Sequence, residues 1–154
     1  VLVGILAALL FAARTFDGSR RDDPILTDVR ENFGLCRVGG GRNCVVDGDN
    51  TADALKPFEN QICITQTKWR PGIDAPETHD FQCAREQQQG ERSARRLQQL
   101  LNSGPLELRR SGRDRDRNGR LLRKVRVNGR DVGEQLVQEK LARSYSGRKL
   151  SWCP

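Results

Sequence analysis

The chain has 154 residues, of which 36% are hydrophobic and 31% are charged, so it suits one small domain with an appendage and excludes a large hydrophobic core. Its net charge of +7 is uneven, because residues 1–83 carry a net −3 and residues 84–154 carry a net +10. Most of the basic residues are arginines, whose guanidinium group can bind phosphate through two hydrogen bonds. The charge therefore favours a polyanionic partner such as nucleic acid, with a solvated surface as the alternative.

The first 13 residues, VLVGILAALLFAA, form an uninterrupted apolar stretch. As a helix it would span about 20 Å, which is less than the roughly 30 Å of a bilayer core. We expect a signal peptide or an N-terminal membrane anchor over residues 1–13, with a buried core helix as the alternative. Either of the first two implies export, to the periplasm, to the medium or to the inner membrane. Residues 14–42 are polar and include three successive glycines, which predicts a flexible tether before a folded domain over 43–154.

The five cysteines are Cys36, Cys44, Cys63, Cys83 and Cys153. They contain no C-x-x-C pair, and the one histidine, His79, is a poor basis for a zinc site. Export would permit disulfides, but the odd number leaves at least one thiol unpaired in a monomer. The sequence leaves the pairing open, although a Cys36–Cys44 bond is sterically easy.

Strand and helix signals alternate from residue 44 onwards. Strands are predicted over 44–46, 61–69, 106–110 and 120–127, and the Asn128–Gly129 pair after the last predicts a hairpin turn. The first helix carries one apolar stripe and ends at Gly104 and Pro105; the stripe consists of Ala94, Leu97, Leu100 and Leu101. Asp131 with Glu134 is typical of a helix start, and the second helix carries Val132, Leu136, Val137 and Leu141. This order predicts an α+β fold, mainly β, with helices packed against a small barrel or curled sheet.

Two short acidic motifs could carry chemistry. In the sequence VVDGDN, Asp47 and Asp49 are two residues apart, so on a strand they would share one face around Gly48. In GIDAPE, the proline favours an extended path that places Asp74 and Glu77 on the same side. Each motif read alone is more simply a solvated acidic turn. Together they offer the oxygen ligands that a hard cation such as calcium prefers.

The arginine-rich sequence DRDRNGR, residues 114–120, reads alone as a solvated hairpin loop. The ordered set is more informative. The succession VVDGDN, GIDAPE, GERSARRLQQLL, DRNGR and VNGRDVGEQLVQEKLA resembles the thermonuclease family, the staphylococcal-nuclease-like domains, over about residues 43–146. It is most similar to exported or membrane-tethered bacterial members that end in a Trp-Cys pair, like SWC here.

The resemblance implies a five-stranded OB-fold barrel with two or three helices packed against it, and a monomeric calcium-dependent nuclease. Such an enzyme cleaves the phosphodiester bonds of DNA and RNA, preferably single-stranded, and leaves 3′-phosphate ends. The implied metal ligands are the carboxylates of Asp49 and Asp74 and the backbone carbonyl of Ala75, with Asp47 supporting them. Glu77 matches the general base. Arg120 matches the second phosphate arginine, Arg70 is the candidate substitute for the first, and the expected nucleic-acid contacts are Arg117, Asn118 and Tyr145.

The chain departs from the family pattern at the first phosphate arginine. That arginine is expected five residues before Asp74, where this chain has Trp69; Arg70 is four residues before and is followed by Pro71. A slip of one residue on a strand turns a side chain to the other face. Asn50 and Asn118 also stand where the family has a threonine and a tyrosine. These departures leave two other functions open, a non-catalytic OB-type nucleic-acid-binding module and a structural envelope domain that meets anionic lipid headgroups.

Overall fold

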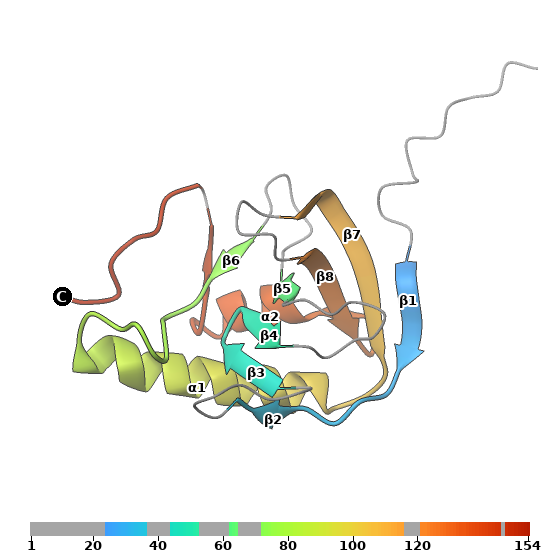
Figure 1. The fold of residues 1–154 in the computed structure, drawn as a ribbon, viewed down its shortest axis with the longest axis horizontal. Coiled ribbons are helices and arrows are strands. Elements are labelled where there is room, and N and C mark those ends of the chain that lie inside the picture. Colours follow the sequence, from blue (N-terminus) through green and yellow to red (C-terminus); the bar gives the residue numbers. More distant parts are fainter. Residues whose placement is uncertain (1–23, 37–43, 53–61, 65–71, 116–120, 146) are drawn as a thin grey trace, which may run out of the picture.

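The computed structural model describes residues 24–36, 44–52, 62–64, 72–115, 121–145 and 147–154 (Figure 1). Within these residues the chain folds into a mixed structure of strands and two α-helices, as predicted. The predicted N-terminal signal or anchor, residues 1–13, lies outside the described part. In the part that is described, no helix is long and apolar enough to cross a membrane.

The centre of the sheet is an antiparallel hairpin of β7 (Leu106–Arg115) and β8 (Leu121–Val127). β8 also pairs in parallel with β5 (Ile62–Ile64) and in antiparallel with β9 (Arg130–Asp131). Asn128 and Gly129 join β8 to β9 with φ angles of 49° and 75°, which is the left-handed backbone of a two-residue type I′ turn. The predicted hairpin turn is therefore confirmed.

The sheet continues on one side through β4 (Asn50–Ala52), β3 (Cys44–Asp47) and β2 (Gly34–Leu35), and on the other through β1 (Pro24–Val29), which pairs with β7. The hydrogen-bonded path β1-β7-β8-β5-β4-β3-β2 is open at both ends, so the described strands do not show a closed barrel. A separate pair joins β6 (Ile73–Asp74) to β10 (Arg143–Ser144).

Residues 24–36 correct the prediction of a tether over 14–42. They supply β1 and β2 and a core residue, Phe33, of which only 2% is exposed. The backbone of Phe33 is fixed by Asn102, whose side chain accepts from its N–H and donates to its carbonyl, both at 2.9 Å. The prediction failed here because polar sequence hides strand pairing with a segment about 80 residues away. The rest of the predicted tether lies outside the described residues.

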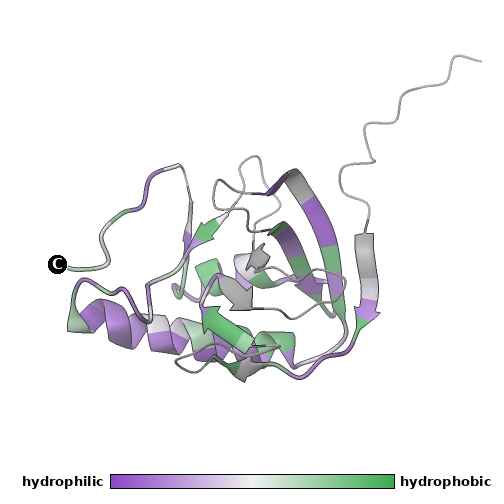
Figure 2. Cartoon of the chain, viewed as in Figure 1, coloured by the Kyte–Doolittle hydropathy of each residue, from purple (hydrophilic) through white to green (hydrophobic). Residues whose placement is uncertain are grey.

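The two helices pack against the sheet and against each other. α1 (Ala84–Leu101) packs against β3 and against α2 (Val132–Gln138), which in turn packs against β8. The predicted stripe of α1 is buried, and Figure 2 shows hydrophobic β3 lying over the helix. α1 begins at Ala84, ten residues before the first residue of the apolar stripe. At this end of the helix, the carboxylate of Glu86 accepts a hydrogen bond from the N–H of Gln82 at 2.7 Å. Asp131 caps α2 as predicted, since its Oδ1 accepts from the N–H of Glu134 at 3.0 Å.

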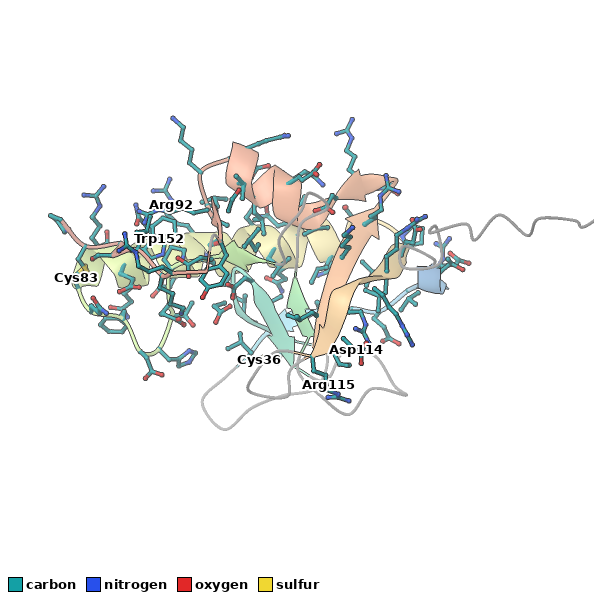
Figure 3. The ribbon with its side chains drawn as sticks, turned by 90° about the horizontal axis from the view of Figure 1, so that it is seen from above. Cys36, Cys83, Arg92, Asp114, Arg115 and Trp152 are labelled. Carbon is teal, nitrogen blue, oxygen red and sulfur yellow. A yellow bond between two sulfur atoms is a disulfide. The ribbon has the colours of Figure 1, made fainter. Side chains whose placement is uncertain are left out.

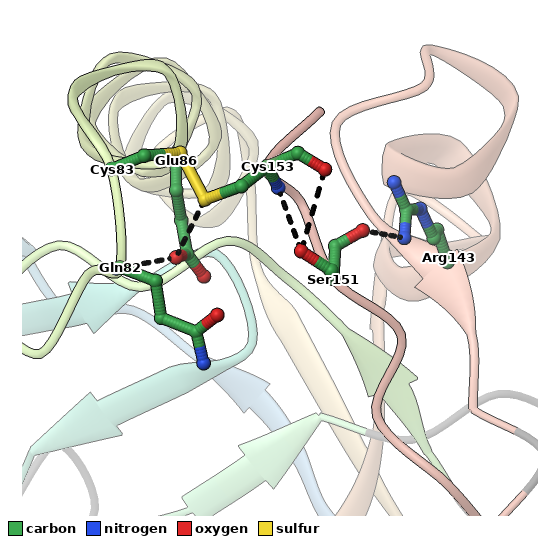
Figure 4. Close-up of a disulfide and its surroundings, with 6 residues drawn as sticks. All are labelled: Gln82, Cys83, Glu86, Arg143, Ser151 and Cys153. Carbon is green, nitrogen blue, oxygen red and sulfur yellow. Dashed lines mark hydrogen bonds between the residues drawn. A yellow bond between two sulfur atoms is a disulfide. The ribbon is translucent and has the colours of Figure 1, made fainter.

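One disulfide joins cysteines that are close in the sequence, and a second joins cysteines that are far apart in it. Cys36 pairs with Cys44, the bond noted as sterically easy, and Cys83 pairs with Cys153 over a separation of 70 residues. The second bond fixes the C-terminus to the residue that precedes α1 (Figure 4). In the loop-entropy model, a closed loop of that length stabilises the fold by about 4 kcal/mol.

Candidate active site

The two acidic motifs meet in the fold. Asp47 ends β3 and Asp49 lies in the turn to β4, rather than both lying on one strand. The Oδ1 of Asp47 accepts from the N–H of Asp49 at 3.1 Å, and the Oδ2 of Asp49 accepts from the N–H of Ala75 at 3.2 Å. Since Ala75 directly follows Asp74, the second bond holds the Asp49 carboxylate against the backbone of the segment that carries Asp74, 25 residues further along the sequence.

Two glycines permit this close approach. A Cβ atom added at Gly48, in the β3–β4 turn, would lie 1.8 Å from the Oγ of Ser93 and 2.9 Å from the Cβ of Ala75. A Cβ atom added at Gly90, in α1, would lie 2.4 Å from the carbonyl oxygen of Glu77. α1 therefore supports the β3–β4 turn and the segment after β6 at once, through contacts that leave no room for a methyl group.

Burial makes the ionised form of these carboxylates costly. Burial, followed by the negative charge of nearby Asp47, raises the pKa of Asp49 well above its usual value. Asp74 is only 5% exposed, and burial raises its pKa although the ammonium of Lys149 acts to lower it. Carboxylates that are crowded and poorly solvated in this way are stabilised as anions by a cation, so the arrangement is suited to binding one.

Glu77 lies beside Asp74 and is more accessible, with 32% of its side chain exposed. Its carboxylate accepts a hydrogen bond from the Nζ of Lys149, and this Nζ is 4.0 Å from the Oδ1 of Asp74. Burial acts to lower the pKa of Lys149, but its bond to Glu77 and the surrounding acids outweigh this and raise it. One ammonium group thus neutralises part of the acidic site.

The C-terminal residues form one wall of the site. β10 pairs with β6 so that Arg143 is opposite Asp74. The guanidinium carbon of Arg143 lies 3.6 Å from the centroid of the Trp152 ring. The indole N–H of Trp152 is near enough to Asp74 to act to lower the pKa of its carboxyl, although the indole nitrogen makes no hydrogen bond. Figure 3 shows Trp152 and Cys83 at the same end of the molecule, away from Arg115. Tyr145 is half-buried, and its N–H donates to the carbonyl of Gly72 at 3.1 Å, next to β6.

Sequence reasoning missed Lys149 and Arg143. Neither residue lies in a segment whose apolar pattern predicts a helix or strand, and neither belongs to an acidic motif. Lys149 is 72 residues from its partner Glu77. The one sequence signal near them is the cysteine of SWC, whose pairing the spacing left open. Four predicted site residues, Arg70, Arg117, Asn118 and Arg120, lie outside the described residues, so their roles stay predictions.

The donor set can be compared with the needs of a metal ion. Among the described residues, no group of three or more His, Cys, Asp or Glu side chains is arranged to hold a metal. Asp49 and Asp74 provide two carboxylates, and Ala75 a backbone carbonyl in the same segment. These groups offer oxygen ligands. Such donors, completed by water, fit a hard cation such as calcium.

The sequence profile of the staphylococcal nuclease homologue family matches residues 71–151, which is slightly more than half of the chain. The chain belongs to the staphylococcal nuclease family. The match includes β6 and the segment after it, both helices, β7, β8 and β10. The fold of this family is an OB-fold. The described residues show its mainly antiparallel sheet and two helices.

Two proteins of Bacillus subtilis (strain 168) are similar to this staphylococcal nuclease domain. The SPbeta prophage-derived endonuclease YokF is 45% identical over 73 residues, which cover 46% of this chain and 24% of YokF. The endonuclease YncB is 44% identical over 73 residues, which cover 46% of this chain and 34% of YncB. The chain therefore matches about a quarter to a third of the length of these relatives.

Proposed function

We propose that this staphylococcal nuclease-family protein is a calcium-dependent nuclease that hydrolyses the phosphodiester bonds of DNA and RNA and leaves 3′-phosphate ends. The observation that carries the proposal is the hydrogen bond from the Ala75 N–H to the Asp49 carboxylate, which joins the two acidic motifs into one site. The endonuclease names of the two Bacillus relatives support the reaction class.

Asp49, Asp74 and the carbonyl of Ala75 are the groups that would bind calcium in this site. Asp47 keeps the β3–β4 turn in place through its hydrogen bond to the Asp49 N–H. When bound, calcium would polarise the phosphodiester and offset the charge that develops on it. The raised pKa values of Asp49 and Asp74 support this assignment, because both carboxylates are stabilised as anions by a nearby cation.

Glu77 is the proposed general base. Its carboxylate is adjacent to the metal-binding groups but remains one-third exposed, so a water molecule can reach it. Glu77 would take a proton from that water as the water attacks the phosphorus. The bond from phosphorus to the 5′-oxygen would break, and the leaving oxygen would take a proton from the solvent. A base in this position typically accelerates a reaction by about 10²- to 10⁴-fold.

Arginines would bind the phosphate that is attacked. Arg120 and Arg70 are the proposed phosphate ligands, and Arg117, Asn118 and Tyr145 the proposed contacts to the nucleotide. Of these, Tyr145 lies beside β6 in the structure, and the others are outside the described residues. The net charge of +10 over residues 84–154 supports a polyanionic substrate. We propose a monomer that prefers single strands, whose bases are free to stack on side chains.

We propose export for this protein, with residues 1–13 as a signal or membrane anchor. The two disulfides support this location, because disulfides form and persist in oxidising compartments.

The proposal is tested with the full chain and a 5′-labelled single-stranded DNA oligonucleotide, incubated with calcium or with a chelator. We expect cleavage only with calcium, and products that a polymerase extends only after phosphatase treatment. Asp74→Asn should lose this activity, while Asp80→Asn, a matched change at an exposed acid six residues away, should keep it. Absence of calcium-dependent cleavage would overturn the proposed function.

One observation favours a second function. Trp69 occupies the expected position of the first phosphate arginine, so the chain could bind nucleic acid without cleaving it. Oligonucleotide binding at submicromolar protein concentration with no cleavage at any calcium concentration would identify this binding module.

A further inference from the structure

The C-terminal segment, residues 147–154, returns from β10 to the acidic site. Lys149 is the residue of this segment that enters the site, with its Nζ bonded to Glu77 and 4.0 Å from the Oδ1 of Asp74. The lysine side chain is 65% exposed, whereas that of Asp74 is only 7% exposed. The ammonium therefore approaches the buried carboxylates from the solvent side, by the route that a dissolved cation would use.

The C-terminal segment is fixed at several points close to Lys149. Cys153, four residues further on, is bonded to Cys83 at the start of α1. The backbone N–H of Cys153 donates to the Oγ of Ser151 at 3.1 Å, and Arg143 donates to the carbonyl of Ser151 at 3.0 Å (Figure 4). These contacts keep the lysine near the site, so its local concentration there is high.

We propose that Lys149 is a tethered cation that is held by Glu77 in the metal-free protein and competes with calcium for Asp74. The proposal rests on the proposed function, because it concerns the same carboxylates. It also assigns a purpose to the Cys83–Cys153 disulfide, which keeps the competing ammonium within reach of the acids.

The competition follows from charge and geometry. The ammonium group is bonded to Glu77 and lies 4.0 Å from the Oδ1 of Asp74, so it sits beside a carboxylate that is also a proposed calcium ligand. Calcium must displace this ammonium before it can bind beside Asp74, and both ion pairs contribute little because their lysine partner is largely exposed to solvent. Together they are expected to lower the affinity for calcium by about tenfold, which is the size of two screened ion pairs.

The test is calorimetric titration of the full chain with calcium chloride, which does not depend on cleavage. We expect Lys149→Gln to bind calcium about tenfold more tightly than the parent. The matched control is Arg148→Gln, which removes one positive charge from the exposed neighbouring residue and should change the affinity less than about twofold. Equal affinities of Lys149→Gln and Arg148→Gln would overturn the proposal, because removal of any local charge would then have the same effect.

A second variant tests the tether. Cys153→Ser removes the long disulfide and leaves Cys36–Cys44 intact, and we expect its calcium affinity to rise towards that of Lys149→Gln. In the double variant, Cys153→Ser should add less than about twofold, because the tether would have no ammonium to position. An equal effect of Cys153→Ser with and without Lys149 would overturn the tethering.

The titration separates failure of this inference from failure of the proposed function. Calcium binding that follows the expected pattern in a protein that never cleaves nucleic acid would support the competition and overturn the nuclease. Calcium-dependent cleavage with no gain in affinity for Lys149→Gln would overturn the competition and support the nuclease. If calcium binds to no variant, there is nothing for Lys149 to compete with, and the inference is overturned.

Discussion

Gly90 lies in α1 where the helix passes under the segment that carries Asp74 and Glu77. An alanine there would place its Cβ 2.4 Å from the Glu77 carbonyl oxygen and 2.9 Å from the Pro76 carbonyl oxygen. An ordinary contact needs about 3.4 Å, so the helix and the segment would have to separate by about 1 Å. Both obstacles are backbone atoms, which cannot rotate away as a side chain would.

The energetic cost of Gly90→Ala is the difference between two effects. Overpacking typically costs about 1–3 kcal/mol, and replacing glycine by alanine within a helix returns about 1 kcal/mol. We therefore expect a net loss of about 0–2 kcal/mol in the free energy of unfolding. The shift of about 1 Å in Glu77 should cost more in activity than in stability, since misplacements of this size can slow an enzyme about 10²-fold.

The assay pairs two measurements on Gly90→Ala, the parent and Gln88→Ala, a control on the exposed face of α1. Denaturant unfolding gives the stability, and the initial rate of calcium-dependent oligonucleotide cleavage gives the activity, at a temperature where all three proteins are folded. A Gly90→Ala variant that is as stable and as active as Gln88→Ala would refute the inference that α1 positions the Glu77 segment.

Three further predictions concern charge. Burial and nearby Asp47 raise the pKa of Asp49, so the stability of the metal-free parent should fall as the pH rises from the pKa of unfolded Asp49 through that of folded Asp49. Asp49→Asn should lack this pH dependence and should melt about 3 °C higher at neutral pH, as measured by thermal unfolding in chelator. Arg120→Ala and Arg70→Ala should each lower the initial cleavage rate about 10²-fold, while Lys68→Ala should change it little; an Arg70→Ala variant at the parent rate would exclude Arg70 as the substitute arginine. Affinity for a single-stranded oligonucleotide in chelator should fall steeply with salt, with a log–log slope of about −3 or steeper from fluorescence anisotropy, and a flat response would argue against binding through phosphate.

The elements that the sequence predicted are those determined by neighbouring residues. The Asn128–Gly129 turn needs two left-handed residues in succession, and these two residue types adopt that backbone easily. Asp131 caps α2 through a residue only three positions away. The apolar stripe of α1 repeats with the helical period and needs no distant partner to be recognised.

The features that the sequence did not predict depend on contacts between distant residues. Strand β1 looks like a polar linker until β7 is placed beside it. The Cys83–Cys153 bond is one of several pairings that five cysteines allow, and Lys149 reaches Glu77 from a segment that this bond joins to the start of α1. The acidic site lies between these cases, because each motif is ambiguous alone and the family resemblance is what connected them.

The role of Glu77 is tested most directly by the initial rate at which the full chain cleaves a single-stranded DNA oligonucleotide at saturating calcium, compared between the parent and Glu77→Gln. The matched control is Glu91→Gln, which makes the same change at an exposed position of α1. If Glu77 removes the proton from the attacking water, Glu77→Gln should cleave about 10²- to 10⁴-fold more slowly than the parent and Glu91→Gln at the parent rate. A Glu77→Gln variant that cleaves as fast as Glu91→Gln would contradict the assignment of this acidic site as the active site.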